Sequence, residues 1–394
     1  MTRSRGVTGV RVGGAWAGSL RSFAVTTSGP DLPTLFQPIT LRELTVRNRV
    51  WTSPMCQYAV EARDGVPNDW HVVHYGSLAV GGFGVVMTEA TAVTPEGRIS
   101  PEDTGLWNDD QVRAWRRITD FAHSRGARMG VQLGHAGRKA STVRWWPGFT
   151  PGIVPESEGG WPVVGPTTQA GDGVESAHTV HALTDGEIEG VIDAFVAATH
   201  RAAEAGFDTV EVHAAHGYLL HQFYSPLSNT RTDRWGGDSE GRTRLVREVA
   251  RAVRGAWPQD LPVIVRLSAV DWRGDGWQLD DSVRLAAQLK DLGVDLVDVS
   301  SGGVAQASIA VGPGYQVPFA ERIRREAGIA TAAVGMITSP KQAEEILEQG
   351  RADVVLLARE ALRDTNWPLR AAHQLGVPAS EAPWQPARWR GAWH

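Results

Sequence analysis

Two histidines and a tyrosine stand close together in the segment Val210-Glu211-Val212-His213-Ala214-Ala215-His216-Gly217-Tyr218. The apolar, β-branched start of this segment predicts a buried strand, and the polar side chains follow where that strand ends. In a parallel α/β fold, polar side chains just past the carboxyl end of a strand point into the active-site mouth. One histidine in such a place is often only a hydrogen-bonded core residue, but His213, His216 and Tyr218 together favour a catalytic site.

A repeating pattern of strands and helices is expected to position these residues. Eight short apolar runs recur along the chain, and each is followed by a stretch long enough for a helix. The runs are Arg49–Ser53, Gly84–Thr88, Arg128–Leu133, the segment that begins at Val210, Val263–Leu267, Leu296–Ser300, Thr331–Val334 and Val354–Leu357. Eight consecutive β/α units predict an α/β fold of the closed (β/α)8, or TIM-barrel, class. An open Rossmann-type sheet would want a Gly-x-Gly-x-x-Gly turn after the first strand, and the chain has Pro54-Met55-Cys56-Gln57-Tyr58 there.

Helix-start signals support this pattern. Thr184 and Glu187 have the spacing of a capping box and predict a helix that begins there. Ser339 followed by Pro340 predicts an N-cap and a first helical position. Glu360–Leu375 is a helix-length stretch that is expected to pack after the eighth strand.

Composition divides the chain into three parts. Residues 1–30 form a basic leader rich in Gly, Ser and Ala, which we expect to be disordered and which fits either an organelle transit peptide or an over-extended translation start. Residues 31–378 are expected to form the barrel as a single domain. Residues 379–394 form a tail that should pack on the barrel or on a neighbouring subunit, because free tryptophans would expose much apolar surface. Those tryptophans are Trp384, Trp389 and Trp393.

Two further segments are expected to elaborate the barrel. Leu35–Ile39 and Leu44–Val46 predict an N-terminal hairpin that closes one end of the barrel as a lid. Ser141–His181 is a long insertion rich in Trp, Pro and Gly after the third strand. Because that strand's carboxyl end faces the active site, the insertion is expected to cover the substrate pocket.

Charge, hydropathy and cysteine content exclude several classes of function. The net charge of −5 and the pI near 6.2 argue against a nucleic-acid partner. No window approaches the roughly 20 apolar residues of a membrane span. Cys56 is the only cysteine, which excludes an internal disulfide framework and a cysteine-ligated iron–sulfur cluster. A cytoplasmic location is the expectation for such a chain.

Other strand ends carry residues that could hold a phosphorylated, ring-containing cofactor. Gly-rich turns follow the sixth and seventh strands, the latter with Gly335, and Arg359 follows the eighth strand. Barrels commonly bind phosphate with the loops after strands seven and eight, so these residues predict a phosphate site. Gln132 and Arg266 emerge from barrel strands, and an amide with a fixed cation suits a flavin ring that has donor and acceptor edges. A buried ion pair between Arg266 and a carboxylate is the plain alternative.

The sequence gives less support to a zinc enzyme, to a flavin-free aldolase or isomerase, and to a redox sensor. A zinc site needs about three protein ligands. His221 is near His213 and His216 in the sequence but is expected to lie in the following segment, and no cysteine is close, so no metal site is predicted. A phosphate-binding barrel aldolase or isomerase that uses no flavin needs a Schiff-base lysine or a carboxylate base at a strand end. Lys139, Lys290 and Lys341 are expected to lie elsewhere. A flavin-binding redox sensor is compatible with Cys56 but has no need of the two histidines and the tyrosine.

Four ordered motifs resemble the Old Yellow Enzyme family of FMN-dependent ene-reductases. They are Ser53-Pro54-Met55-Cys56-Gln57-Tyr58, Gln132-Leu133-Gly134-His135-Ala136-Gly137-Arg138, His213-Ala214-Ala215-His216-Gly217-Tyr218 and Ser228-Asn229-Thr230-Arg231-Thr232-Asp233-Arg234-Trp235-Gly236-Gly237. The cysteine in the first motif is typical of the bacterial thermophilic-like, or xenobiotic-reductase, class. The resemblance runs from about Leu35 to Arg390. Larger flavoproteins of the dienoyl-CoA reductase type share this barrel but need a cysteine-ligated cluster.

The resemblance implies non-covalently bound FMN and NADPH as cofactors. The residues that would touch the isoalloxazine ring are Ser53, Pro54, Met55, Cys56, Ala90, Gln132 and Arg266. Ala358 and Arg359 would hold the phosphate beside Gly335, although the family usually has Gly-Arg there. If that loop needs a positive φ, Ala358 would be strained.

The resemblance also implies the reaction and the substrate. NADPH would reduce FMN, and hydride would then pass to the β-carbon of an α,β-unsaturated carbonyl or nitro compound. His213 and His216 would bind the substrate oxygen, Tyr218 would donate the proton, and Tyr58 would contact substrate over the flavin. Cys56 would tune the redox behaviour of the flavin. The class forms dimers or tetramers, in which an arginine, here Arg388 or Arg390, reaches a neighbour's active site.

Overall fold

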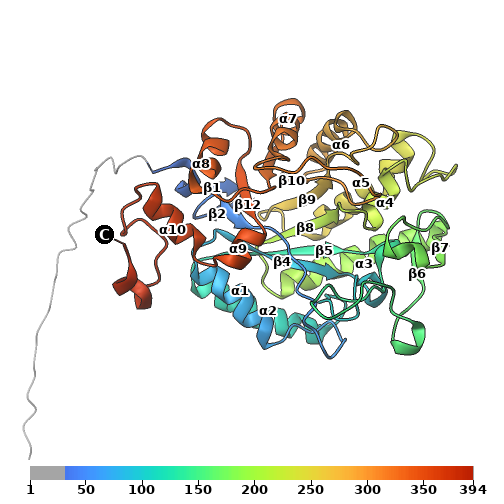
Figure 1. The fold of residues 1–394 in the computed structure, drawn as a ribbon, viewed down its shortest axis with the longest axis horizontal. Coiled ribbons are helices and arrows are strands. Elements are labelled where there is room, and N and C mark those ends of the chain that lie inside the picture. Colours follow the sequence, from blue (N-terminus) through green and yellow to red (C-terminus); the bar gives the residue numbers. More distant parts are fainter. Residues whose placement is uncertain (1–31, 394) are drawn as a thin grey trace, which may run out of the picture. The chain divides into compact units, whose positions relative to one another are not determined.

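A parallel sheet of eight strands forms the centre of the computed structural model, which describes residues 32–393. Neighbouring strands follow the order β3-β12-β11-β10-β9-β8-β5-β4, and helices lie around them (Figure 1). At the remaining seam, the Gly84 amide donates to the Val50 carbonyl oxygen at 3.0 Å and the Met87 amide donates to Thr52 Oγ1 at 2.7 Å. The strands are β3 (Val50–Thr52), β4 (Val85–Ala92), β5 (Arg128–Gly134), β8 (Thr209–Ala214), β9 (Val263–Ser268), β10 (Leu296–Ser300), β11 (Ala330–Ala333) and β12 (Val354–Leu357). The predicted TIM-barrel fold is confirmed.

A helix follows every barrel strand. The helices are α1 (Asp69–Val80), α2 (Asp109–Ser124), α3 (Asp185–Glu204), α4 (Leu219–Tyr224), α5 (Ser239–Ala256), α6 (Leu279–Asp291), α7 (Val317–Ala327), α8 (Pro340–Glu348), α9 (Arg359–Arg363) and α10 (Trp367–Gln374). Both predicted caps are confirmed, since Thr184 and Glu187 form a reciprocal capping box and Ser339 accepts from the Gln342 amide. These caps satisfy amides that no residue inside the helix can satisfy.

A hairpin plugs the amino-terminal end of the barrel. Its strands are β1 (Ile39–Leu41) and β2 (Leu44–Val46), which pair antiparallel. Their buried side chains pack with Trp51, Val85 and other residues that point into the barrel. The predicted hairpin lid is confirmed, but its first strand begins later than expected, because Leu35 lies in a short 3₁₀ helix over Thr34–Phe36.

The insertion after β5 is ordered by a small sheet and by loop contacts. Strands β6 (Val163–Gly165) and β7 (Val180–Ala182) pair parallel within it. Asp172 in the insertion accepts a hydrogen bond from the Gln306 amide on Oδ2, and its carbonyl oxygen accepts one from Gln306 Nε2, each at 2.8 Å. The insertion is therefore tied to the loop that follows β10.

The C-terminal stretch Glu360–Leu375 follows the last strand and is divided between two helices, α9 and α10. The polar residues Asp364, Thr365 and Asn366 separate the two helices, and Pro368 favours a new helix start. In the tail, Trp393 stacks on His373 with ring centroids 5.2 Å apart, and Gln385 Nε2 donates to the Arg125 carbonyl oxygen at 3.0 Å.

Strand β4 is longer than predicted. It runs past Thr88 to Ala92, with a register shift between Met87 and Ala90, so that Glu89 and Ala90 lie within the strand. The expected disordered leader lies outside the described residues. Within residues 32–393, no helix combines the length and the apolar character that crossing a membrane requires.

Candidate active site

The loop after β3 places its residues beside those after β8. Cys56, Tyr58, Ala90 and Tyr218 all pack against one apolar cluster that includes Ile99. Burial, together with the carboxylates of Asp103 and Glu89, raises the pKa of the half-buried Cys56 thiol, so it is protonated at neutral pH. Burial also raises the pKa of Tyr58.

The histidines and tyrosine of the first predicted motif converge at the carboxyl end of β8. The ring centroids of His213 and His216 are 5.3 Å apart, and those of His213 and Tyr218 are 4.9 Å apart. His213 Nδ1 accepts from the Ala215 amide at 3.3 Å, which assigns the proton of the neutral ring to Nε2. His216 Nε2 lies 2.7 Å from the Ser300 hydroxyl oxygen.

Both imidazoles are neutral at physiological pH. Burial lowers the pKa of His213 and of His216 well below 6.5, and the positive charge of Arg266 lowers each further. A neutral imidazole has a single N–H group, so its hydrogen bond to the protein decides where that group points.

A polar network crosses the barrel interior next to these histidines. Gln132 Nε2 donates to Glu211 Oε1 at 2.7 Å, and Arg266 Nε lies 2.9 Å from Asp298 Oδ2. Arg266 Nη2 also donates to Ser53 Oγ at 2.9 Å. Gln132 and Arg266 thus each hold one buried carboxylate, and the two pairs are linked by the electrostatic interaction of Glu211 with Arg266 and Asp298. The plain alternative, a buried arginine–carboxylate pair, is present.

Glu211 and Asp298 are members of this network that the sequence analysis missed. Burial raises the pKa of both, to about 8 for Glu211 and about 6 for Asp298. An alternating pattern in the sequence could have predicted both residues. In Glu211-Val212-His213 and Asp298-Val299-Ser300 polar residues alternate with apolar ones, so the polar side chains share the barrel-facing side of the strand.

A cavity of about 540 Å³ opens beside Arg266 at the ends of β10, β11 and β12. Gly335, Ala358 and Arg359 line it, as predicted for a phosphate cradle. Ala358 has φ −100°, so the strain that a positive φ would have caused does not arise. In the part of the chain that the structure describes, Arg359 is exposed and has no ion-pair partner, which leaves its charge available to an anion. The full lining is Arg266, Ser300, Val311, Tyr315, Gln316, Val334, Gly335, Met336, Ile337, Thr338, Leu356, Ala358, Arg359, Glu360 and Arg363.

A second cavity, of about 430 Å³, lies beside Tyr58 and Tyr218. Thr142, Trp145 and Val174 of the insertion contribute to its wall. This observation agrees with the expectation that the insertion covers the substrate pocket.

Lys139 corrects a prediction, because it lies at this second cavity rather than away from the strand ends. Its Nζ donates to the carbonyl oxygens of His216, at 3.1 Å, and Gly303, at 2.9 Å, and lies 5.6 Å from the ring centroid of Tyr218. Lys139 belongs to the short 3₁₀ helix Gly137–Lys139 that directly follows β5, so its distance from the strand end was overestimated. Its bonds to two carbonyl groups give it a structural role that differs from that of a Schiff-base lysine.

Over residues 32–393, no group of three or more His, Cys, Asp or Glu side chains is arranged to hold a metal ion.

Comparison with known proteins places the chain. The family model described as "NADH:flavin oxidoreductase / NADH oxidase family" matches residues 34–377. An NADPH dehydrogenase of Geobacillus thermodenitrificans is 47% identical over 359 residues, which cover 90% of this chain and 98% of the relative. One of Halalkalibacterium halodurans is 44% identical over 91% of this chain and 98% of the relative.

Solved structures agree with this placement. Morphinone reductase in complex with tetrahydroNAD is 26% identical, with a TM-score of 0.72 over 91% of this chain and 94% of that one. The Old Yellow Enzyme homologue from Zymomonas mobilis is 25% identical, with a TM-score of 0.72 over 92% of this chain and all (100%) of that one. The predicted resemblance, the oxidoreductase class and the cofactors FMN and NADPH are confirmed. The chain belongs to the NADH:flavin oxidoreductase / NADH oxidase family of FMN enzymes.

Proposed function

We propose that this protein is an ene-reductase that uses NADPH to reduce the carbon–carbon double bond of an α,β-unsaturated carbonyl or nitro compound. When bound, FMN supplies the hydride chemistry, since NADPH reduces it and the β-carbon of the alkene then receives the hydride. The observation that carries the proposal is the convergence of His213, His216 and Tyr218 beside Cys56 and Tyr58, next to a cavity with the polarity that FMN requires.

Residues at the ends of several barrel strands are suited to the ring and to the phosphate of FMN. Gln132, Arg266 and the loop Ser53–Cys56 would contact the ring, whose edge carries both donors and acceptors. Gly335, Ala358 and Arg359 would hold the phosphate, where a cation without an ion-pair partner is well suited to an anion. The cavity volume of about 540 Å³ lies within the range of about 300–1,000 Å³ that is common for cofactor sites.

His213 and His216 would bind the oxygen atom of the substrate. His213 can donate from Nε2, and His216 can donate from Nδ1 when the Ser300 hydroxyl donates to its Nε2. Negative charge grows on the substrate oxygen as hydride reaches the β-carbon, so two N–H donors aimed at that oxygen stabilise the transition state more than the ground state.

Tyr218 would deliver the proton to the α-carbon. A phenol is a weak acid that holds its proton at neutral pH and can donate it during the reaction. The ammonium group of Lys139, 5.6 Å from the Tyr218 ring centroid, would stabilise the phenolate left after that transfer. Tyr58, which lines the same cavity, would also contact the substrate, and the protonated Cys56 would lie beside the flavin.

The test uses purified protein loaded with FMN. It should be yellow, and it should consume NADPH anaerobically when 2-cyclohexenone is added. Replacing both His213 and His216 with Ala should abolish binding of a phenol, whose oxygen imitates the substrate oxygen, while FMN stays bound. Phenol binding that survives the double replacement would refute the assigned role of the histidines, and a protein that cannot be loaded with FMN would refute the proposed function.

A further inference from the structure

The turn that joins β8 to α4 has an unfavourable backbone. His216 and Gly217 both have left-handed backbone angles, with φ of 59° and 75°. A positive φ is sterically unfavourable for a residue other than glycine. At Gly217 a side chain is sterically excluded as well, because a Cβ would lie 2.1 Å from the Gly303 carbonyl oxygen. This turn separates His213 from Tyr218, so its shape sets the directions of the side chains on both sides.

Side chains from three parts of the barrel hold this dipeptide in place. All four of its backbone polar groups bond to side chains. The His216 amide donates to Ser268 Oγ at 2.9 Å, and the His216 carbonyl oxygen accepts from Lys139 Nζ at 3.1 Å. The Gly217 amide donates to His221 Nδ1 at 2.9 Å, and the Gly217 carbonyl oxygen accepts from Gln222 Nε2 at 2.7 Å. The strained turn therefore depends on these partners rather than on its own backbone preference.

Hydrogen bonds at both ring nitrogens fix the orientation of His221. Since Nδ1 accepts from Gly217, the neutral ring carries its proton on Nε2, which donates to Asp271 Oδ1 at 2.8 Å. The imidazole also stacks on Tyr224, with ring centroids 4.6 Å apart. The His221 and Asp271 side chains are completely buried, so water cannot replace either bond.

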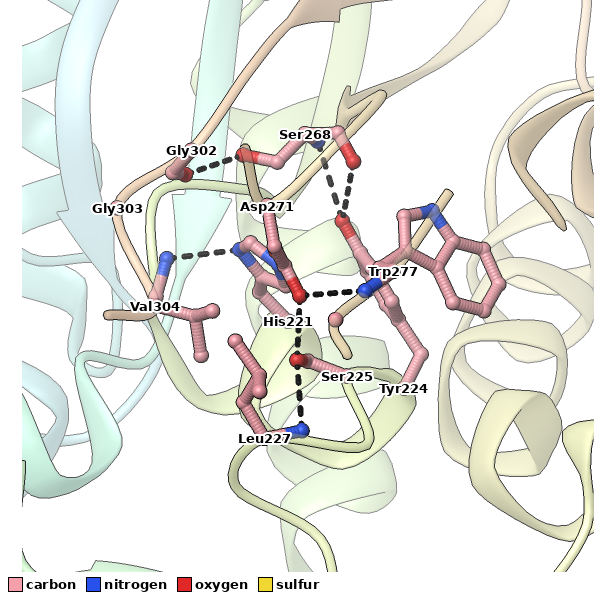
Figure 2. Close-up of polar contacts among 12 residues, drawn as sticks. His221, Tyr224, Ser225, Leu227, Ser268, Asp271, Trp277, Gly302, Gly303 and Val304 are labelled. Atoms are coloured by element: carbon pink, nitrogen blue, oxygen red, sulfur yellow. Dashed lines mark hydrogen bonds and ion pairs between the residues drawn. The ribbon is translucent and has the colours of Figure 1, made fainter. Parts of the chain in front are cut away.

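Asp271 is in turn fixed by two further donors (Figure 2). Its Oδ2 accepts from the Ser225 hydroxyl at 2.6 Å and from the Trp277 amide at 2.8 Å. Burial alone would raise the pKa of Asp271, but His221 and these hydrogen bonds outweigh it and hold the pKa below its usual value. Asp271 is thus a carboxylate with three donors, which locks the tautomer and the plane of the His221 ring.

We propose that His221, oriented by Asp271, is a positioning residue for the substrate site. By accepting the Gly217 N–H, it stabilises the strained turn that directs His216 and Tyr218 towards the substrate. This inference rests on the proposed function, because it assumes that His213, His216 and Tyr218 bind and protonate the substrate. His221 itself does not touch the substrate, since its two ring nitrogens bond to Gly217 and Asp271.

Three replacements of His221 separate its two hydrogen bonds. In His221→Asn the amide oxygen takes a place close to that of Nδ1 and can still accept from Gly217. In His221→Gln the longer amide reaches towards Asp271 instead. His221→Phe removes both bonds and keeps a ring of similar size.

Phenol affinity of the FMN-loaded protein is the main measurement, followed through the absorbance of the bound flavin. We expect His221→Phe and His221→Gln to lose tenfold or more in phenol affinity, and His221→Asn to stay within about threefold of the wild type, since one buried hydrogen bond corresponds to roughly a factor of ten. The KM for 2-cyclohexenone should rise and kcat should fall in the same order, while the FMN content stays unchanged.

A matched control lies at the opposite end of the same strand. His123 Nε2 and Asp208 Oδ2 are 2.7 Å apart, and Asp208 directly precedes β8. His123→Phe removes this histidine–aspartate pair and should lower the melting temperature without changing phenol affinity.

The outcomes that overturn the proposal are distinct from those that overturn the proposed function. Wild-type phenol affinity in His221→Phe, with only a lower melting temperature, would mean that His221 merely stabilises the fold. If His221→Phe does not fold, equal affinity in His221→Asn and His221→Gln would overturn the proposal in the same way. If the wild-type protein binds no phenol and reduces no 2-cyclohexenone, the proposed function fails before any variant is compared.

Discussion

Single residues at this site owe their protonation states to burial. His213 and His216 are neutral because a charged imidazole would lose its hydration and meet the charge of Arg266. The Cys56 thiol is protonated for the same reason, with Asp103 and Glu89 adding to the effect. A site with neutral imidazoles and a protonated phenol can donate hydrogen bonds and protons to a substrate that becomes negatively charged.

Replacing Tyr218 with Phe tests the proton donor. The variant should lose alkene reduction by about 10²- to 10⁴-fold, the usual contribution of a positioned general acid. Reduction of bound FMN by NADPH should continue, because that step needs no proton from Tyr218. Stopped-flow absorbance of the flavin separates the two half-reactions, and equal slowing of both would contradict the assignment.

His135 makes stability depend on pH. Burial lowers its pKa to about 4, whereas an unfolded chain has a value of about 6.5. Between these values the unfolded state binds more protons, so folding stability is lost as the pH falls below about 6.5. From pH 7 to pH 5 this one residue should cost about 2 kcal/mol.

His135→Asn should remove that part of the pH dependence. The Asn side chain can still accept from the Gly137 amide, which now bonds to His135 Nδ1 at 3.0 Å. Urea unfolding at pH 7 and pH 5 gives the free energies of unfolding for both proteins. The loss on acidification should be smaller in the variant by about 2 kcal/mol, and an equal loss would show that His135 is not the responsible group.

At the scale of elements, one end of the barrel is packed with apolar side chains and the other carries the candidate active site. The hairpin β1–β2 and the residues around Trp51 fill the amino-terminal end with apolar side chains. The carboxyl-terminal end carries the polar network and the strained turn after β8. Rigid strands with an apolar floor hold the loops at the other end in place, which is how barrels commonly separate stability from chemistry.

Trp51→Ala tests the floor of the barrel. Trp51 is 2% exposed, and its Nε1 donates to the Asn48 carbonyl oxygen at 3.0 Å. Its removal leaves a cavity and should lower the free energy of unfolding by about 3–5 kcal/mol. Val73→Ala is the control, since Val73 is 66% exposed on α1 and should change stability by no more than about 0.5 kcal/mol. Equal effects of the two replacements in chemical unfolding would contradict this account of the core.

At the scale of the whole molecule, the C-terminal tail carries two arginines that could contact a neighbouring subunit. Arg388 Nη1 donates to Asn366 Oδ1 at 3.2 Å, and the Arg388 and Arg390 side chains are exposed. Their exposure is compatible with the proposal that one of them reaches the active site of a neighbouring subunit in a dimer or tetramer. The stack of Trp393 on His373 would keep the tail in place while it does so.

Truncation after Glu381 tests this proposal. We expect turnover of 2-cyclohexenone to fall while FMN stays bound, because the FMN-binding residues belong to the barrel. Arg388→Ala and Arg390→Ala, which keep the tryptophans, then identify the arginine that matters, and sedimentation measures the oligomer. Full activity in the truncated protein would refute the proposal.

The amino-acid sequence by itself determined the order of strands and helices, the barrel class and the family. Apolar runs, caps such as Thr184 and the ordered motifs around His213 are local features, so they can be recognised without knowledge of the fold. They also placed Arg266, Gly335 and Arg359 at strand ends that the structure brings together around one cavity. Gln132, on another strand, bonds to the buried Glu211.

Only the tertiary structure decided how those residues are held. The pairing of Arg266 with Asp298, the position of Lys139 against His216 and the bond from Gly217 to His221 depend on strand register and on the packing of loops. The break between α9 and α10 was also missed, although Pro368 was a local signal for it. A contact between residues far apart in the chain cannot be recognised from either segment alone, because the type of one residue does not identify its distant partner.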